Sequence, residues 1–259
     1  MDIIAHRGAS HDAPENTLAA ARLGWQQGAE AVEIDVHLTR DKRLGVIHDD
    51  NTRRTAGLDR KVSDQTLEQL CQLDAGAWKG KQWAGEKIPS IDDLLAAIPP
   101  GQRLVIEVKE GPAAIPVLAQ AVQRSGRKTN ELVIIGFDFD AMKAAREAFP
   151  DIPVLWLANF DDRQQADRPQ PTIEELIQKA VAARFDGLNL SYKWPINGPF
   201  VKKVKDAGLK LYVWTVDDAE VARELVAAGV DGITTNRPRW LRERINGLIP
   251  PNPAKDANE

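Results

Sequence analysis

Residues 31–36, Ala-Val-Glu-Ile-Asp-Val, are an apolar run that carries two carboxylates, Glu33 and Asp35. The run follows an amphipathic stretch ending at Gly28, where a buried parallel strand is expected. Side chains alternate across a strand, so the two carboxylates share one face and repel each other. A hard divalent cation that prefers oxygen ligands makes such a pair tolerable. An exposed acidic strand is the common alternative for such a pair, but it does not suit this position.

Seven further strand-like runs alternate along the chain with stretches of helical periodicity. The predicted strands are 2–5, 31–36, 104–108, 132–135, 154–157, 187–190, 211–214 and 232–235; helical periodicity marks 17–27, 91–97, 113–124, 141–149, 173–183, 200–207 and 219–228. Eight βα units predict an α/β fold, a (β/α)₈ TIM barrel. The length of 259 residues also fits one such barrel.

A ninth apolar run, Leu44–His48, does not belong to the barrel. About seven residues separate it from the second strand, whereas a parallel crossover needs about a dozen or more. We therefore predict an antiparallel hairpin that turns near Asp41 and Lys42. This hairpin brings His48 level with Asp35, beside the carboxylate pair.

All four histidines lie in the first 48 residues, and two of them end apolar runs. His6 ends the first strand and His48 ends the hairpin, where each imidazole can serve acid/base chemistry. His11 lies in a polar loop, and we expect it to be solvated. We expect His37 to alternate away from Asp35 and to point out of the barrel, and assign neither His11 nor His37 a role.

The third predicted strand ends with Glu107 and Lys109, a position where TIM barrels carry their chemistry. Glu107 offers a third oxygen ligand for a cation, and Lys109 offers a point charge for a phosphate oxygen. Arg7, beside His6, offers a bidentate fork for the same anion. Three carboxylates and a divalent cation sum to about −1, and the two basic side chains restore attraction for an anion. This charge balance favours a phosphodiester over a neutral sugar, although a surface ion-pair set remains the alternative for Glu107 and Lys109.

The domain organisation follows from the same pattern. We predict a single catalytic domain over residues 1–247, with a small insertion of short helices after the second strand, at about 49–90. The insertion contains Trp78 and Trp83, and either closes over the barrel as a lid or shapes the substrate entrance. Residues 248–259 are rich in proline and polar residues and are predicted to be a disordered tail.

Composition excludes several classes of partner. The net charge is −4, and basic and acidic residues are dispersed, so no nucleic-acid partner is expected. The chain has neither a signal-peptide pattern nor 18 uninterrupted apolar residues, which predicts a cytoplasmic protein without stable membrane association. Cys71, the only cysteine, lies in a helical apolar pattern and is expected to pack rather than react.

Several short motifs recur in a characteristic order: His6-Arg7-Gly8, Pro14-Glu15-Asn16-Thr17, Glu33-Ile34-Asp35-Val36, Thr39-Arg40-Asp41, His48-Asp49, Glu107-Val108-Lys109, Val213-Trp214-Thr215-Val216 and Gly229-Val230-Asp231-Gly232. In this order and spacing, the chain resembles the glycerophosphodiester phosphodiesterase family, in its cytoplasmic bacterial type. The resemblance extends nearly from end to end. It implies metal-dependent hydrolysis of glycerophosphodiesters, such as glycerophosphocholine or glycerophosphoethanolamine, to sn-glycerol 3-phosphate and an alcohol.

The resemblance also assigns roles to nine residues: His6 and His48 to acid/base catalysis, Glu33, Asp35 and Glu107 to one divalent cation, Arg7 and Lys109 to phosphate, Glu15 to polar support and Trp214 to an apolar wall. All-oxygen ligation admits Mg²⁺, Ca²⁺ or Mn²⁺. Two positions depart from the family: Asp217 where Asn is frequent, and Asn236 where Asp is frequent. Because both come late in the chain, away from the metal set, we expect them to affect substrate preference more than chemistry.

Other functions remain open at this stage. A lysophospholipase D-type phosphodiesterase uses a similar site, and an exposed apolar rim would favour it. An aldolase- or enolase-type barrel also uses carboxylates with a lysine but does not need two histidines and Arg7. A non-catalytic barrel that binds a phosphate ligand predicts broken site positions, and none is broken. The sequence leaves open the metal, the headgroup, the oligomeric state, the division of acid and base roles, and whether a glycerol hydroxyl or water attacks.

Overall fold

Eight parallel strands close into a barrel in the computed structural model, which describes residues 1–160 and 171–248. The strands are β1 (Asp2–Ala5), β2 (Ala31–Leu38), β4 (Arg103–Val108), β5 (Leu132–Gly136), β6 (Val154–Ala158), β7 (Gly187–Ser191), β8 (Lys210–Trp214) and β9 (Gly232–Thr235). Strand β1 pairs with both β2 and β9, which closes the ring. The predicted (β/α)₈ fold is therefore confirmed.

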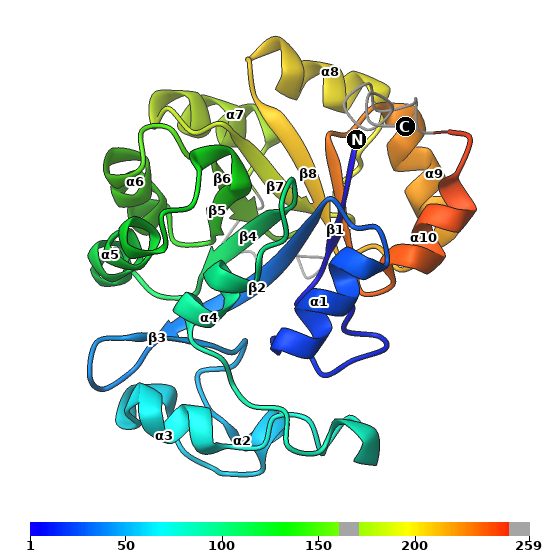
Figure 1. Ribbon diagram of the computed structural model, residues 1–259. Helices are drawn as coiled ribbons and strands as arrows, with labels where there is room; N and C mark the ends of the chain where they lie inside the picture. Colours follow the sequence, from blue (N-terminus) through cyan, green and yellow to red (C-terminus); the bar gives the residue numbers. More distant parts are fainter. Residues whose placement is uncertain (161–170, 249–259) are drawn as a thin grey trace.

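Helices surround this barrel on its outside (Figure 1). They are α1 (Leu18–Gln26), α4 (Ile91–Ala97), α5 (Ile115–Ser125), α6 (Phe139–Ala148), α7 (Ile173–Ala182), α8 (Gly198–Asp206), α9 (Ala219–Ala228) and α10 (Pro238–Ile245). Seven of them agree with the predicted ranges within two residues, and α10 was not predicted. Helix α6 starts before its apolar periodicity because Asp138 caps it by accepting a hydrogen bond from the Ala141 amide.

The predicted hairpin is also present. Strand β3 (Leu44–Val46) runs antiparallel to β2, with Val36 opposite Val46. The strand is shorter than the predicted run, but the Ile47 amide still donates to the Asp35 carbonyl at 3.0 Å. The hairpin thus delivers the segment that bears His48 to the end of β2.

Alternation along the strands divides the apolar residues into two layers. One set fills the barrel interior: Ile4, Ala31, Val105, Val133, Ile135, Leu155, Leu157 and Tyr212. The larger set, which includes Ile34 and Val36, packs between the strands and the helices. Glu33 and Asp35 therefore point inward, as their alternation with Ile34 and Val36 predicts.

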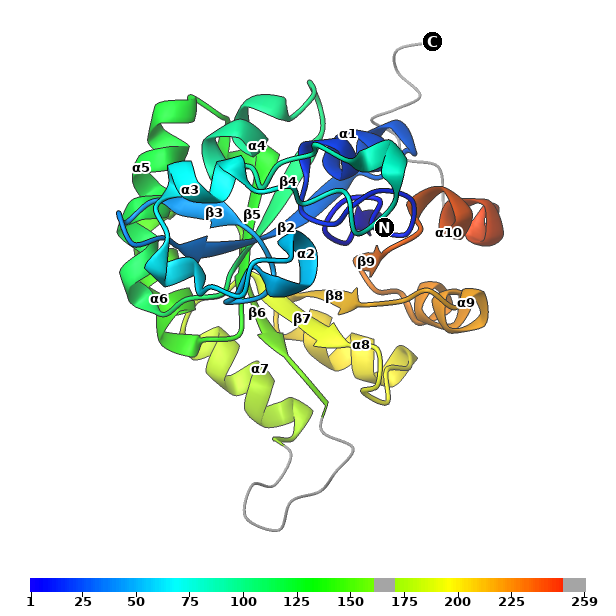
Figure 2. The same cartoon turned by 90° about the horizontal axis from the view of Figure 1, so that it is seen from below.

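Residues 49–90 contain α2 (Arg53–Ala56), α3 (Leu67–Gln72) and two 3₁₀ turns (Val62–Asp64 and Lys81–Trp83). Figure 2 shows α2 and α3 in front of the barrel end. A separate apolar cluster of Ile47, Val62, Leu70, Ala75 and Ile88 holds the segment together. The lid or entrance role and the single-domain assignment over 1–247 stay predictions, and all but the first residue of the predicted tail 248–259 lies outside the described residues.

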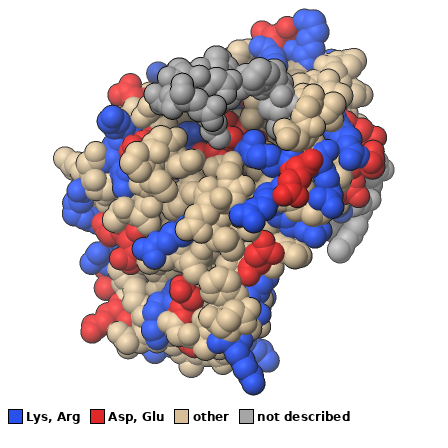
Figure 3. All heavy atoms as spheres, turned by 45° about the vertical axis from the view of Figure 1, so that its right-hand side comes forward, with Lys and Arg blue, Asp and Glu red and all other residues tan. Residues whose placement is uncertain are grey.

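Charged side chains of both signs are scattered over the face in Figure 3 among many uncharged residues. Ion pairs join some of the surface charges of the molecule, as between Lys202 and Asp206 on α8 at 2.7 Å. Within the described residues, the helices are too short or too polar for any of them to traverse a bilayer.

Candidate active site

Three carboxylates meet at the carboxyl ends of β2 and β4. Register places Asp35 directly opposite Glu107, and Glu33 precedes Asp35 on the same face. Each of Glu33, Asp35 and Glu107 offers an oxygen, and these oxygens lie within 4.8 Å of one another. All three side chains are buried. The structure thus brings together the predicted ligand set.

The carboxylate cluster fits a hard divalent cation. Among the described residues, no hydrogen-bond donor reaches the buried Glu33 Oε1, and Asp35 Oδ1 is left with the Lys109 ammonium at 3.3 Å. Burial, followed by repulsion from Asp35, raises the pKa of Glu107 to about 7, although Lys109 opposes the shift. Burial, Asp35 and Glu107 likewise raise the pKa of Glu33 well above its usual value. A cation bound to these oxygens offsets the repulsion and accepts the unsatisfied lone pairs.

Two basic side chains border the carboxylates. Lys109 Nζ lies 2.8 Å from Glu107 and 3.3 Å from Asp35, and Arg7 Nε lies 3.3 Å from Asp35. Burial opposes ionisation of Asp35, but Lys109 and Arg7 outweigh it and lower the pKa of this carboxyl. Glu15 accepts from Arg7 Nη1 at 2.9 Å and so fixes the guanidinium. The site therefore combines a cation-binding floor with two positive side chains for an anion.

The two ring nitrogens of His6 have different roles: Nδ1 is hydrogen-bonded outside the pocket, and Nε2 is available for proton transfer. Its Nδ1 lies 2.8 Å from Asn236 Oδ1, and the amide group of Asn236 is oriented because its Nδ2 donates to Asp217. Since an amide oxygen only accepts, Nδ1 carries the proton and Nε2 is the acceptor. Burial, reinforced by Arg7, lowers the pKa of His6 to about 4. His6 is therefore held neutral with an unprotonated Nε2.

The contact with His6 contradicts the reason behind one expectation from the sequence. Asp217 and Asn236 were expected to affect substrate preference more than chemistry because they come late in the chain, away from the metal set. Instead, the two side chains hydrogen-bond to each other, and Asn236 also contacts His6. Strand β9, which precedes Asn236, pairs with β1, which precedes His6, so closure of the barrel brings residues 230 positions apart together.

His48 has a carboxylate partner instead. Its Nδ1 donates to Asp49 Oδ1 at 2.7 Å, which again leaves Nε2 as the acceptor. Hydrogen bonds from Arg54 and His48 hold the pKa of Asp49 well below its usual range, so Asp49 is ionised. Burial lowers the pKa of His48, although Asp35 acts in the opposite direction. Both candidate acid/base histidines thus share one tautomer but differ in the charge of their partner.

The other two histidines give one error and one agreement. His37 was expected to point out of the barrel, but its side chain is buried, with Nε2 3.0 Å from the His48 carbonyl and Nδ1 2.8 Å from Glu110. The expectation was wrong because residues 35 and 37 are two apart and share a face. The His11 side chain is exposed and its ring pairs with the neighbouring Asp12, as expected for a solvated loop residue.

A pocket with about 450 Å³ of empty space, part of it open to solvent, lies above the carboxylates. Seven of the nine predicted site residues line it: His6, Arg7, Glu33, His48, Glu107, Lys109 and Trp214. The remaining two, Asp35 and Glu15, contact Arg7 from outside the pocket. On the opposite wall, Phe137 meets Trp214 edge-on with ring centroids 5.6 Å apart.

Sequence reasoning missed several residues of the site. Phe137, Asn189 and Thr234 line the pocket, and Asn16 holds Asp35 by donating to Oδ2 at 2.8 Å. Phe137 follows β5 directly, so its position at a strand end was the available signal. Asn16 lies in a loop, and its quoted motif carried no indication of the residue that it contacts.

A TIM barrel with a three-carboxylate floor, two histidines and two basic side chains at one mouth defines a candidate metal-dependent enzyme for an anionic substrate. A sequence model of the Glycerophosphoryl diester phosphodiesterase family matches residues 6–239. The chain therefore belongs to that family, and the predicted enzyme class, a phosphoric diester hydrolase, is confirmed.

Relatives and solved structures agree with this placement. Bacillus subtilis YhdW is 35% identical over 93% of this chain and 96% of its own length. The glycerophosphodiester phosphodiesterase of Caldanaerobacter subterraneus subsp. tengcongensis is 33% identical over 92% of this chain and 95% of its own. An Oleispira antarctica phosphodiesterase, solved in complex with the product sn-glycerol-3-phosphate, superimposes with a TM-score of 0.84 at 28% identity, covering 95% of this chain and 97% of that one.

Proposed function

We propose that this protein hydrolyses glycerophosphodiesters, such as glycerophosphocholine and glycerophosphoethanolamine, to sn-glycerol 3-phosphate and an alcohol. The observation that carries the proposal is the convergence of a carboxylate cluster, two histidines and two basic side chains on one pocket. The similar Oleispira antarctica enzyme binds sn-glycerol-3-phosphate, which supports a product of that kind here.

Glu33, Asp35 and Glu107 are the proposed ligands of one divalent cation, Mg²⁺ or Ca²⁺, with Mn²⁺ also admitted by their oxygens. When bound, such a cation polarises a phosphoryl oxygen and neutralises part of the developing charge. Glu33 Oε1 supports this assignment, because among the described residues no donor reaches this buried oxygen.

Arg7 and Lys109 are the proposed phosphate ligands. Both line the pocket and both already contact carboxylates of the cluster, so their charges are oriented before substrate arrives. Oriented donors stabilise charge that develops in the transition state without reorganising. Glu15 supports Arg7 from behind through its hydrogen bond to Nη1.

His6 and His48 are the proposed acid/base pair. Each presents Nε2 as the nitrogen that exchanges a proton, because each Nδ1 donates to an oxygen outside the reaction path. One takes the proton of the attacking group, the glycerol 2-hydroxyl or water; the other first binds a proton from solvent at Nε2 and gives it to the departing alcohol. A positioned acid or base of this kind contributes roughly 10²–10⁴-fold to the rate.

The apolar wall of the pocket supports a second candidate substrate. Trp214 lies inside the pocket, and Phe137 at its rim is 44% exposed. The wall suits the carbon skeleton of glycerol, and an exposed aromatic rim also suits the first methylenes of an acyl chain. Lysophospholipids are therefore the alternative substrate class.

The decisive experiment measures sn-glycerol 3-phosphate release from glycerophosphocholine, after EDTA treatment and again after Mg²⁺, Ca²⁺ or Mn²⁺ is restored. We expect metal-dependent release that Glu107→Gln, His6→Gln and His48→Gln each reduce by at least about 100-fold. His11→Gln is the matched control, since the exposed His11 ring pairs with Asp12 and does not line the pocket. Cleavage of lysophosphatidylcholine alone would favour the second candidate, and a folded protein that cleaves neither substrate with any metal would refute the proposal.

A further inference from the structure

Arg54, on α2 of the inserted segment, holds two carboxylates at once. Its Nε and Nη2 lie 2.7 and 3.0 Å from the two oxygens of Asp49. Its Nη1 lies 2.8 Å from Glu15 Oε2, and its Nη2 lies 2.8 Å from Glu15 Oε1. A planar guanidinium is the side chain that forms two such forks, and these charge-assisted bonds are among the stronger ones in proteins.

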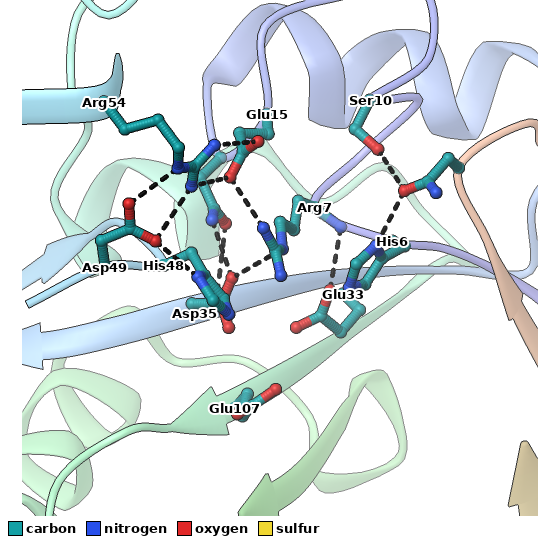
Figure 4. Close-up of polar contacts among 12 residues, drawn as sticks. His6, Arg7, Ser10, Glu15, Glu33, Asp35, His48, Asp49, Arg54 and Glu107 are labelled. Atoms are coloured by element: carbon teal, nitrogen blue, oxygen red, sulfur yellow. Dashed lines mark hydrogen bonds and ion pairs between the residues drawn. The ribbon is translucent and has the colours of Figure 1, made fainter. Parts of the chain in front are cut away.

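Each of these carboxylates also contacts a residue of the proposed active site. Glu15 Oε1 is shared between Arg54 and Arg7, which lies 2.9 Å away. Asp49 Oδ1 is shared between Arg54 and His48 Nδ1, which lies 2.7 Å away. Figure 4 shows the continuous path, with Arg54 above and Arg7 and His48 below it.

We infer that Arg54 is a positioning residue, which orients Arg7 through Glu15 and His48 through Asp49. The inference rests on the proposed function of that site. Arg54 does not line the pocket, and its guanidinium is engaged by Asp49 and Glu15. Arg54 makes the inserted segment part of the catalytic arrangement, because its side chain orients both the anion ligand Arg7 and the acid/base group His48.

The charges explain why Arg54 is needed. Asp49 and Glu15 come from different loops, and the guanidinium of Arg54 lies between their negative charges and pairs with both. Without it, Asp49 keeps His48 as its remaining side-chain partner, and Glu15 keeps Arg7. Both carboxylates would then rotate or hydrate, and a misplacement of about 1 Å at a reacting group costs roughly 10²-fold in rate.

A purely structural role is the competing explanation, because Arg54 also ties the inserted segment to the barrel. Arg53 provides a matched control on the same short helix. Its guanidinium lies 3.6 Å from Asp59, and both side chains are well exposed. Arg53→Met therefore removes one arginine and one ion pair from α2 without touching the path to the pocket.

The test compares Arg54→Met, Arg54→Lys and Arg53→Met, each checked for its melting temperature, in steady-state hydrolysis of glycerophosphocholine. We expect Arg54→Met to lower kcat/KM about 10- to 100-fold, Arg54→Lys to recover part of that loss, and Arg53→Met to stay within twofold of wild type. In an Asp49→Asn background the effect of Arg54→Met on kcat should be smaller than in wild type but should not vanish, because the path to His48 is already broken whereas the path through Glu15 to Arg7 remains.

A second readout does not depend on activity. Nitrogen-15 NMR of the four histidine rings, with His48 assigned through His48→Gln, reports the proton on Nδ1. We expect that proton to exchange faster with water in Arg54→Met than in Arg53→Met or wild type. Unchanged exchange together with kcat/KM within twofold of the Arg53→Met value would overturn the inference. If wild type cleaves no diester, the proposed function fails, and the NMR comparison alone decides whether Arg54 orients His48.

Discussion

Exchanging Asp217 and Asn236 should change the proton affinity of His6. The double variant Asp217→Asn, Asn236→Asp keeps one carboxylate and one amide in contact, but moves the negative charge to the side chain beside His6. In the wild-type protein an amide oxygen lies 2.8 Å from His6 Nδ1, and the carboxylate of Asp217 contacts the far side of that amide. We therefore expect the imidazolium form of His6 to be stabilised in the double variant.

The structure sets the size of this effect. Burial, followed by Arg7, lowers the pKa of His6 to about 4. Opposite unit charges about 4 Å apart interact by about 4 kcal/mol at an effective dielectric constant of 20. One pKa unit corresponds to about 1.4 kcal/mol, so the new carboxylate raises the pKa of His6 by up to about 3 units, towards 7.

The same shift alters stability at acidic pH. A histidine whose folded pKa is below its unfolded value contributes stability at higher pH, and this contribution is lost as pH falls. For wild-type His6 the loss runs from about pH 6.5 down to about pH 4 and amounts to about 3 kcal/mol. In the double variant this contribution to acid destabilisation should nearly vanish, because the folded and unfolded pKa values become similar.

The assay is an NMR titration of the histidine ring protons in metal-free protein between pH 4 and 8, with His6 assigned through His6→Gln. Ser10→Ala is the control, since Ser10 donates to the same amide oxygen of Asn236 at 2.7 Å without changing any charge. We expect the His6 midpoint to move upward by more than one unit only in the double variant. A midpoint that matches wild type would refute the assignment of Asn236 as the partner that controls His6.

Three further predictions follow from single side chains. Glu107→Gln should weaken divalent cation binding at least about 10-fold in calorimetry, and equal affinity would remove Glu107 from the ligand set. Gly8→Ala should lower the free energy of unfolding, measured in urea, by about 3 kcal/mol or more, because the added Cβ would lie 2.4 Å from the Ala20 carbonyl carbon and φ is +82°. Gly126→Ala is the control: φ is +63° but the space around the Cβ is open, so the loss should be only about 1–2 kcal/mol. Phe137→Ala should raise KM for glycerophosphocholine more than it lowers kcat, since Phe137 forms part of the pocket wall; an unchanged KM would contradict that role.

Much of the fold could be predicted because it depends on local periodicity. Alternation over 31–36 identified a strand whose carboxylates share a face. The short connection to Leu44–His48 was enough to predict an antiparallel hairpin there. Helix α10 escaped prediction: its sequence, Pro-Arg-Trp-Leu-Arg-Glu-Arg-Ile, is dominated by charge, and only three of its eight residues are buried. Its apolar stripe is too short to stand out as a period of 3.6 residues.

Some residues of the candidate site could likewise be predicted from local pattern, and others could not. Glu33, Asp35 and Glu107 were predictable because parallel strands end at one edge of a barrel, so residues at strand ends become neighbours whatever their separation in sequence. The error at His37 came from counting alternation wrongly, not from missing information. By contrast, no local pattern connects Asn236 to His6, since neither residue belongs to a regular strand.

The sequence by itself determined the barrel, its hairpin, the inward carboxylates and the family, because periodicity, connection length and motif order are properties of the chain alone. Only the tertiary structure decided which side chains orient the chemistry. Closure of β9 onto β1 places Asn236 against His6, and the packing of the inserted segment places Arg54 between Glu15 and Asp49. These contacts depend on directions and distances of a few ångströms between segments distant in sequence, and spacing along a chain does not encode them.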